Sequence, residues 1–165
     1  MTKILYTIRH AQAENGADIK DFDRKLTSDG ERQAGDLAKH MTEKSYNPGV
    51  FLVSSAARTQ GTFFCLGMGE QQIVKENFYD GTAGDYLEEI KTISDDKDEA
   101  AVIGHNPSIS DLTRFLVEKG ADEVRLMIMS GFKKGMMVAV KFDTDHWAEI
   151  GAVKGNAFDV FVPQE

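Results

Sequence analysis

The sequence predicts an α/β fold, a three-layer sandwich in which a mostly parallel central sheet carries helices on both faces. Three short apolar runs, at 3–8, 51–55 and 100–105, have the length and composition of strands buried on both sides. Segments with the apolar spacing of amphipathic helices separate these runs. Strands that alternate with helices of this length form crossover units, which favour parallel pairing.

The first run, KILYTI at 3–8, is rich in β-branched and aromatic residues and too short for a stable helix. It predicts a first strand, and Arg9 and His10 come directly after it. The runs FLVSS at 51–55 and AAVIGH at 100–105 have the same form and end in serine, glycine and histidine. We therefore expect three strands that each finish in polar residues.

Four helices are predicted between and after these strands. Thr27 is expected to cap the first, which YNPG at 46–49 ends, and the second is expected over 56–66. The other two are predicted from apolar residues at helical spacing, which are Tyr86, Leu87, Ile90 and Ile93 for the third and Ile109, Leu112 and Leu116 for the fourth. Gly120 is expected to stop the fourth helix.

The last third of the chain changes character. GMMVAVKF at 135–142 and FDVFV at 158–162 predict two further strands, and a short turn, DTDHW, follows the first of them. SDDKDE at 94–99 is expected to be a solvated acidic loop. Because the chain has 165 residues and no internal repeat, we expect a single domain over 1–165.

Composition excludes several classes of partner. The net charge of −8 argues against nucleic acid, because duplex binding needs a basic face that displaces counterions. No apolar run has the length of a membrane span, and the N-terminus lacks the pattern of a signal peptide. The single cysteine, Cys65, cannot form an internal disulfide. We expect a cytoplasmic protein without nucleic-acid or membrane partners, which binds anions only through locally gathered positive charges.

Arginine and histidine residues gather where the three predicted strands end. Arg9 and His10 follow the first strand, Arg58 follows the second and His105 the third, and carboxyl ends of parallel strands meet at one sheet edge. Arginine forks bind phosphoryl oxygens, a neutral imidazole can attack phosphorus, and a second, protonated histidine would add a donor. The pattern therefore indicates phosphoryl transfer.

Each of these residues alone has an ordinary interpretation as a surface, capping or strand-end residue. Arg58, near the start of a helix, opposes the helix dipole unless an anion is bound there. The joint occurrence at three strand ends favours a functional site. His40 and His146 have no such context, and we expect them to be surface or structural residues.

Motifs along nearly the whole chain resemble the histidine phosphatase superfamily. IRHAQAE, with Ala11, resembles the branch of SixA-type phosphohistidine phosphatases. The segments at 21–34, 54–62 and 102–112 (DFDRKLTSDGERQA, SSAARTQGT and VIGHNPSISDL) are similar to further family motifs in the same order, and DTDHWAEI with Pro163 resembles the ending of small SixA-like proteins. The resemblance implies a phosphoglycerate mutase-like α/β sandwich, phosphatase activity, and no metal or other cofactor.

The resemblance also implies roles for individual residues. It matches His10 to the nucleophile and assigns phosphoryl binding to four others, Arg9, Arg58, His105 and Asn106. Three more residues are candidates on the substrate side, Asp21, Lys133 and Lys134. The two lysines, in FKKG, stand where many relatives carry Pro-Thr; they either attract an acidic partner or phosphate tail, or lie in a solvated turn.

The sequence departs from the family pattern around Arg58. Ser55 stands where proline is usual, Thr59 where alanine is usual, and Gly61 where glutamine is usual. These changes are expected to loosen the helix start that aims Arg58.

The absence of an evident general acid bears on the substrate. The candidates Asp80, Asp85 and Glu88 are more simply explained as the first turn and solvent face of a helix. A phosphate ester expels an alkoxide and needs an acid, whereas the weak P–N bond of phosphohistidine needs less help. The sequence favours a phosphatase that hydrolyses phosphohistidine on a protein. The alternatives are a phosphatase of a small phosphate ester and a non-catalytic phosphate-binding module.

Overall fold

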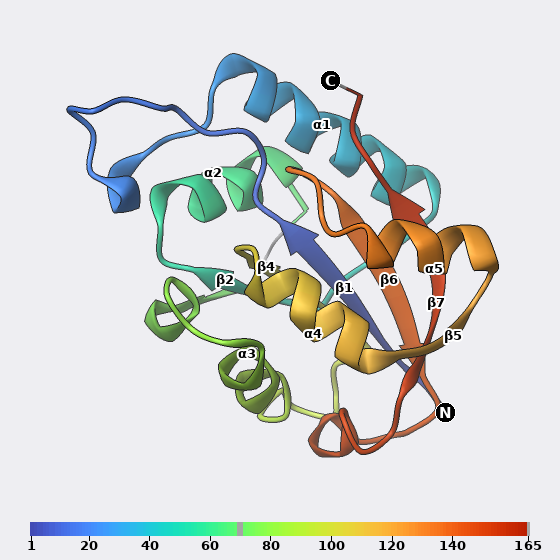
Figure 1. Ribbon diagram of the computed structural model, residues 1–165. Helices are drawn as coiled ribbons and strands as arrows, with labels where there is room; N and C mark the ends of the chain where they lie inside the picture. Colours follow the sequence, from blue (N-terminus) through green and yellow to red (C-terminus); the bar gives the residue numbers. More distant parts are fainter. Residues whose placement is uncertain (69–70, 165) are drawn as a thin grey trace.

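The computed structural model describes residues 1–68 and 71–164, and shows a sheet of seven strands covered by helices (Figure 1). The strands are β1 (Lys3–Arg9), β2 (Val50–Ser54), β3 (Gln72–Lys75), β4 (Glu99–Gly104), β5 (Val117–Gly120), β6 (Met137–Phe142) and β7 (Gly155–Phe161). The helices are α1 (Ser28–Glu43), α2 (Ala57–Leu66), α3 (Ala83–Ile90), α4 (Ser108–Leu116) and α5 (Asp122–Met129). Short 3-10 turns lie at Asp21–Asp23, Glu76–Phe78 and Trp147–Glu149.

The sheet has the strand order β3-β2-β4-β1-β6-β7-β5. The pairs β2–β3, β2–β4, β1–β4 and β5–β7 are parallel, whereas β6 is antiparallel to both of its neighbours, β1 and β7. Within the described residues, β6 is therefore the strand that runs against the others. The prediction of a mostly parallel sheet is confirmed.

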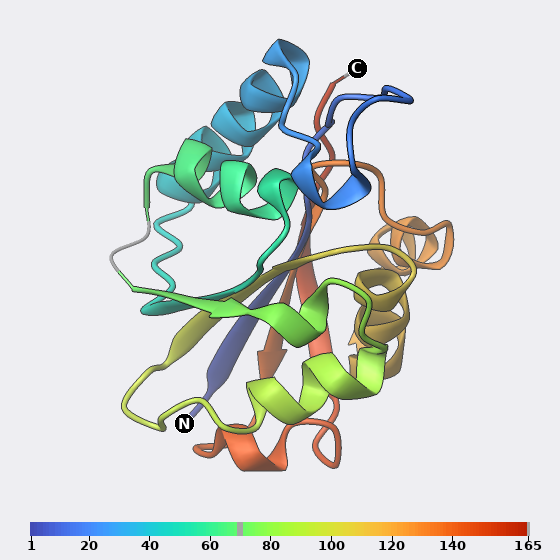
Figure 2. The same ribbon diagram turned by 90° about the vertical axis from the view of Figure 1, so that its left-hand side faces the viewer.

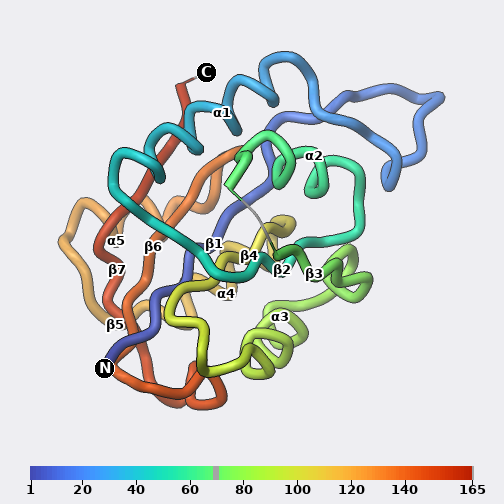
Figure 3. The backbone as a smooth tube through the Cα atoms, turned by 180° about the vertical axis from the view of Figure 1, so that it is seen from behind, coloured from blue at the N-terminus to red at the C-terminus, as the bar shows by residue number. Residues whose placement is uncertain are grey.

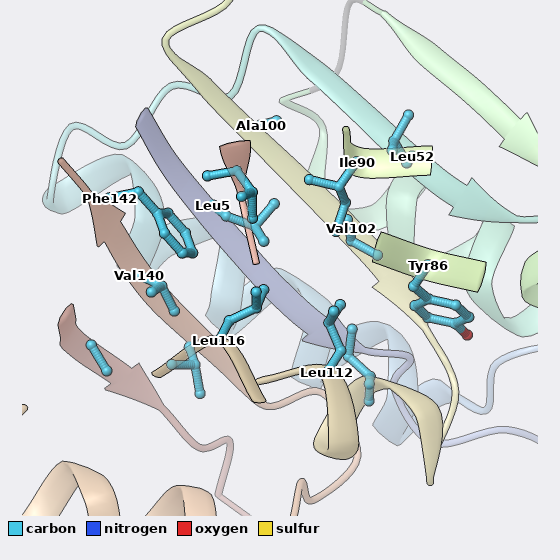
Figure 4. Close-up of a cluster of buried hydrophobic side chains, with 14 of the residues drawn as sticks. Leu5, Leu52, Tyr86, Ile90, Ala100, Val102, Leu112, Leu116, Val140 and Phe142 are labelled. Carbon is cyan, nitrogen blue, oxygen red and sulfur yellow. The ribbon is translucent and has the colours of Figure 1, made fainter. Parts of the chain in front are cut away.

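Alternate residues of the strands face two separate cores. Leu5 belongs to a cluster of buried residues that also contains Tyr86 of α3 and Leu112 of α4 (Figure 4). The next residue, Tyr6, belongs to a second cluster that contains Leu37 of α1. Figure 2 shows α1 and α2 on one face of the sheet and α3, α4 and α5 on the other. This side-to-side alternation along the strands produces the predicted three layers.

The predicted strands and helices are present, with differences at their ends. Thr27 caps α1 by accepting a hydrogen bond from the Gly30 amide at 3.0 Å. The helix ends at Glu43, before YNPG, and α3 ends at Ile90, so Ile93 lies outside it. The chain leaves α4 at Leu116 rather than continuing toward Gly120, because the next four residues form β5 along β7.

The short edge strand β3, the strand β5 and the helix α5 were not expected from the sequence. Their residues are partly exposed, and the apolar ones show little periodicity. Contacts with neighbouring strands and helices therefore decide the conformation of these three elements. The segment 94–99 is also not a freely solvated loop, since Glu99 begins β4 and the carbonyls of Asp95 and Lys97 accept hydrogen bonds from Lys3. Across the described residues, no helix combines the length and apolar character that crossing a membrane requires.

The end of the chain lies against α1. Seen from behind, the last residues run beside this helix, at the opposite end of the molecule from the N-terminus (Figure 3). Arg32 of α1 donates a hydrogen bond to the carbonyl of Gln164 at 3.2 Å. The last described residues thereby reach the edge of the sheet at which β1 ends, where the predicted site residues lie.

Candidate active site

Parallel pairing brings the two predicted site histidines together. β1 and β4 lie in register with Arg9 opposite Gly104, so His10 and His105 leave the sheet side by side. Their ring centroids are 5.4 Å apart, with the planes inclined by 55°. Arg58, in the first turn of α2, comes from the end of the next strand, β2, and is only 6% exposed. The order of the strands therefore brings together site residues that lie far apart in the sequence.

His10 is held in a single orientation by its neighbour's backbone. Its Nδ1 lies 2.8 Å from the carbonyl oxygen of Ala11, and since a carbonyl only accepts, Nδ1 carries the proton and donates. This hydrogen bond leaves the lone pair on Nε2. Burial and the nearby charges of Arg58 and Arg9 lower the pKa of His10 to about 3. His10 is therefore neutral near pH 7 and can act as a nucleophile.

His105 is fixed by two hydroxyl groups. Its Nε2 lies 2.7 Å from Ser54 Oγ, and its backbone amide donates to the Tyr86 hydroxyl at 3.1 Å. Gly104 permits this close approach, because a Cβ there would lie 2.4 Å from a Tyr86 ring carbon. Burial and Arg58 lower the pKa of His105 to about 4, so the imidazole is neutral near pH 7. The protonated His105 expected at a bound phosphoryl group stays a prediction, and burial of the ring opposes that charge.

Arg58 meets Asp21 at the mouth of the site. Its Nη1 donates to the Asp21 carbonyl at 2.7 Å and its Nη2 to the Asp21 carboxylate at 3.1 Å. The Tyr79 hydroxyl donates to the same carboxylate at 2.6 Å. The Tyr79 hydrogen bond and the charge of Arg58 lower the pKa of Asp21 to about 2. Asp21, which was predicted on the substrate side, is therefore a charged residue that binds the two terminal nitrogen atoms of the Arg58 guanidinium group.

Three buried nitrogen atoms around His10 have no hydrogen-bond partner among the described residues: Arg9 Nε, Arg58 Nε and His105 Nδ1. Buried polar groups are nearly always paired, because an unmade hydrogen bond costs about 1–3 kcal/mol. The three atoms come from β1, α2 and the end of β4, and they belong to residues predicted to bind a phosphoryl group. An anion with several oxygens supplies the acceptors they lack.

Thr59, one of the residues that depart from the family pattern, makes a hydrogen bond at the start of α2. Thr59 Oγ1 lies 2.8 Å from the Ser54 carbonyl, closing the turn that precedes Arg58. Thr62 donates to the Arg58 carbonyl at 2.8 Å and accepts a hydrogen bond from the Ala11 amide at 3.0 Å. These hydroxyl groups connect the helix start to its surroundings, and the expected loosening by the three departures stays a prediction.

Asn106 uses its amide to hold a neighbouring turn. Its Nδ2 donates to the Phe132 carbonyl at 2.9 Å, and its Oδ1 accepts from the Ser110 hydroxyl at 2.6 Å. Arg9 Nη1 donates to the same Phe132 carbonyl at 2.9 Å. Asn106 thereby braces the site through the turn at 131–136, and its contact with a phosphoryl group stays a prediction.

Two of the three acidic residues considered as general acids, Asp85 and Glu88, have structural partners. Asp85 accepts a hydrogen bond from the Thr82 amide and forms a capping box at the start of α3, and Glu88 pairs with Lys91 at 3.6 Å. Within residues 1–68 and 71–164, no group of three or more histidine, cysteine or acidic side chains is arranged to hold a metal ion.

Lys133 and Lys134 lie next to the site rather than in a remote turn. They line a cavity of about 460 Å³ whose wall also contains Arg9. The two histidines left out of the site have structural partners, since His40 pairs with Asp159 at 2.7 Å and His146 with Asp95 at 2.9 Å. This confirms the interpretation of both as surface or structural residues.

The chain is similar in sequence or in structure to several known proteins. No family model matches the chain. Uncharacterized proteins of two Mycobacterium tuberculosis strains are each 28% identical over 144 residues, which is 87% of this chain and 91% of theirs. A Nakamurella multipartitia protein assigned as phosphohistidine phosphatase SixA superposes with a TM-score of 0.84 at 24% identity, covering 100% of this chain and 98% of that one. The chain has the SixA fold.

Two further structures have a similar fold. The protein histidine phosphatase SixA complexed with tungstate has a TM-score of 0.78 at 19% identity, with 97% of each chain covered. Phosphoglycerate mutase from Plasmodium falciparum has a TM-score of 0.64 at 18% identity, with 99% of this chain and 96% of that one covered. The prediction of a phosphoglycerate mutase-like sandwich is confirmed.

Within this SixA fold, three contacts of the site were not assigned from the sequence. Ser54 stands in the motif that led to Arg58, and its place at a strand end was the available signal. Tyr79 and Tyr86 lie 58 residues from Asp21 and 19 residues from His105, respectively, and reach them only through folding. No spacing in the sequence indicates either contact.

Proposed function

We propose that the protein is a phosphatase that hydrolyses phosphohistidine on another protein through a covalent phosphoryl intermediate on His10. One observation carries this proposal: a neutral His10 with Nε2 available, beside unpartnered buried nitrogens of Arg9, Arg58 and His105. The similarity to a SixA structure that binds tungstate supports it, because tungstate is a tetrahedral oxyanion like phosphate.

In the first step, the lone pair of His10 Nε2 attacks phosphorus, and the P–N bond of the substrate breaks. The bonding electron pair passes to the substrate imidazole, which leaves neutral when its other nitrogen already carries a proton. Arg9 and Arg58 donate to the equatorial oxygens as charge shifts during transfer. His105 adds a donor from Nδ1 when the Ser54 hydroxyl donates to Nε2.

In the second step, water attacks the phosphorus of phospho-His10. The P–N bond breaks, its electron pair returns to Nε2, and the proton of the water goes to the departing phosphate. The Ala11 carbonyl keeps the Nδ1 proton in place throughout, so the ring returns to its starting tautomer. Both steps proceed with the residues that surround His10.

The acid that contacts Arg58 bears on the substrate class. Asp21, which contacts Arg58, has a pKa of about 2 and is ionised near neutral pH, so it holds no proton to give a leaving alkoxide. A phosphorylated imidazole needs no such proton. This supports a phosphohistidine substrate over a phosphate ester, with a phosphorylated protein as the partner. The cytoplasmic location stays a prediction.

The proposal is tested by phosphate release from a phosphohistidine peptide and from a panel of small phosphate esters, together with trapping of an acid-labile phosphoenzyme. We expect the wild type to hydrolyse the peptide and form the phosphoenzyme, and His10→Ala to do neither while keeping its thermal midpoint. The exposed His146→Ala variant is the matched control and should behave as wild type.

Other outcomes would select the alternatives. Preference for an ester would keep the mechanism and assign the substrate to small metabolites. A wild type that binds phosphate but releases none from any substrate would make the protein a phosphate-binding module.

A further inference from the structure

The cavity beside Arg9 is basic, although the chain as a whole carries a net charge of −8. Its wall contains four cationic side chains, those of Arg9, Arg32, Lys133 and Lys134. Asp29 is the one acidic residue among the described residues of the wall, and it lies 4.0 Å from Arg32. A positive cavity on an acidic protein concentrates anions at one place and repels them elsewhere.

The charge of the cavity comes mainly from the two lysines. Arg32 is largely neutralised, because it pairs with Asp36 at 3.2 Å as well as with Asp29. Arg9 is shared with the phosphoryl site, where its Nη1 already donates to a carbonyl. Lys133 and Lys134 are exposed at the rim, so their ammonium groups can turn toward a bound group.

The turn that carries the lysines is fastened to the nucleophile itself. The amide of Gly135 donates to the carbonyl oxygens of Arg9 at 3.2 Å and His10 at 2.9 Å. Gly135 has a φ of +77°, a conformation that favours glycine, and the Met136 amide closes the turn on the Lys133 carbonyl at 3.0 Å. The backbone at Lys133 and Lys134 is therefore held at a fixed place relative to His10.

The other end of the same turn is anchored in the core. Phe132 is 3% exposed, and its carbonyl binds both Arg9 and Asn106. Its amide donates to the Ser110 hydroxyl of α4 at 3.1 Å. A solvated turn needs none of these contacts, and together they fix the position of the lysines beside the site.

We propose that the cavity is a subsite for a second anionic group of the substrate, bound next to the phosphoryl group by Lys133 and Lys134. In a protein substrate, this group is a carboxylate of an acidic segment that flanks the phosphohistidine. The inference rests on the proposed function for the phosphoryl end of the site. It adds selection among phosphorylated substrates by the charge that surrounds the phosphoryl group.

The test compares binding of two peptides that carry a stable, non-hydrolysable phosphohistidine analogue, one with flanking aspartates and one with flanking asparagines. We expect the wild type to bind the acidic peptide about tenfold more tightly, and the preference to shrink with added salt. The double variant Lys133→Gln/Lys134→Gln should lose this preference. Lys141→Gln, on β6 at the opposite end of the sheet, is the matched control and should keep it.

Equal affinity of the wild type for the two peptides, or a preference that survives in the double variant, would overturn the inference. The binding assay needs no turnover, so a protein that prefers acidic peptides yet releases no phosphate would refute the proposed function alone. A third arm uses phenyl phosphate with and without a ring carboxylate. A lysine-dependent preference confined to that pair would overturn the protein-borne carboxylate and assign the second anion to a small molecule.

Discussion

Lys3 at one end of the sheet and Arg58 at the other are both buried cations, 2% and 6% exposed, yet their surroundings differ. Lys3 Nζ has three acceptors, namely Asp95 O at 2.7 Å, Lys97 O at 3.0 Å and Asp98 Oδ1 at 3.3 Å. Arg58 keeps a buried Nε without a partner, as does Arg9 beside it. Where the protein supplies every acceptor, the charge stabilises the fold; where donors lack acceptors, the proposed function gives them an anion to bind.

Histidines at the two ends show the same difference. At the Lys3 end, His146 Nδ1 donates to the Asp95 carboxylate at 2.9 Å, and this hydrogen bond raises the pKa of His146. At the other end, burial lowers the pKa of His10 to about 3 and that of His105 to about 4. One end therefore stabilises a charged imidazole, and the other keeps two imidazoles neutral; the attack proposed for His10 requires a neutral ring.

The largest expected effect is on catalysis at the Arg58 end. Arg58→Ala should lower kcat/KM for a phosphohistidine peptide by about 10²–10³-fold, because it removes a donor to the transferring phosphoryl group. Its thermal midpoint should not fall, since its carboxylate partner, Asp21, stays solvated. Arg114→Ala, which removes an exposed arginine paired with Asp111, is the control. A loss of less than threefold would remove Arg58 from the site.

The second effect is on stability at the Lys3 end. Lys3→Met keeps the length of the side chain but leaves the carbonyls of Asp95 and Lys97 without this donor. The free energy of unfolding in urea should fall by about 2–3 kcal/mol, whereas kcat/KM should match the wild type. A change in kcat/KM without a change in stability would reverse the assigned roles of the two ends.

A bound anion should give the Arg58 end the acceptors that Lys3 already has. Tungstate at ten times its dissociation constant should raise the free energy of unfolding of the wild type by about 1.4 kcal/mol. Thermal unfolding with and without tungstate measures this. Arg58→Ala should show little of the increase at the same concentration, and an equal increase in both proteins would place the anion elsewhere.

The pH dependence should differ in sign between the two ends, with smaller effects. The unfolded chain binds more protons than the folded one between pH 6.5 and about 4, because folding lowers the pKa values of His10 and His105. The free energy of unfolding should therefore fall as the pH drops through this window. Urea titrations at several pH values should show a shallower fall in the free energy of unfolding for His105→Asn. An unchanged slope of this free energy against pH would contradict the lowered pKa of His105.

His146 should contribute in the opposite sense and least of all, because it is exposed. Its pKa is raised in the folded protein, so its contribution is fully present below pH 6.5 and is lost as the pH rises through the folded value. The free energy of unfolding of the wild type should fall slightly as the pH rises above 6.5, and His146→Asn should not show this fall. The same urea titrations, extended to pH 8, check this.

Local patterns determined much of the architecture. The apolar runs that became β1, β2 and β4, and the apolar spacing in α1 and α4, depend on residues a few positions apart, so the sequence displays them directly. Because parallel strands present their carboxyl ends at one edge, the position of Arg9, His10, Arg58 and His105 after such runs was enough to predict their convergence. The strands β3 and β5 and the helix α5 lack this local signal.

Tertiary structure decided what each site residue can do. The sequence placed His105 in the site, and burial and the charge of Arg58 lower its pKa so that the ring is neutral near pH 7. Asp21 reached Arg58 across 37 residues, and the turn carrying Lys133 reached the carbonyl of His10 from the far end of the chain. Hydrogen-bond partners and burial are properties of groups that meet only in the folded chain. The sequence therefore determined which chemical groups stand at the sheet edge, and only the fold decided which of their atoms remain free to bind.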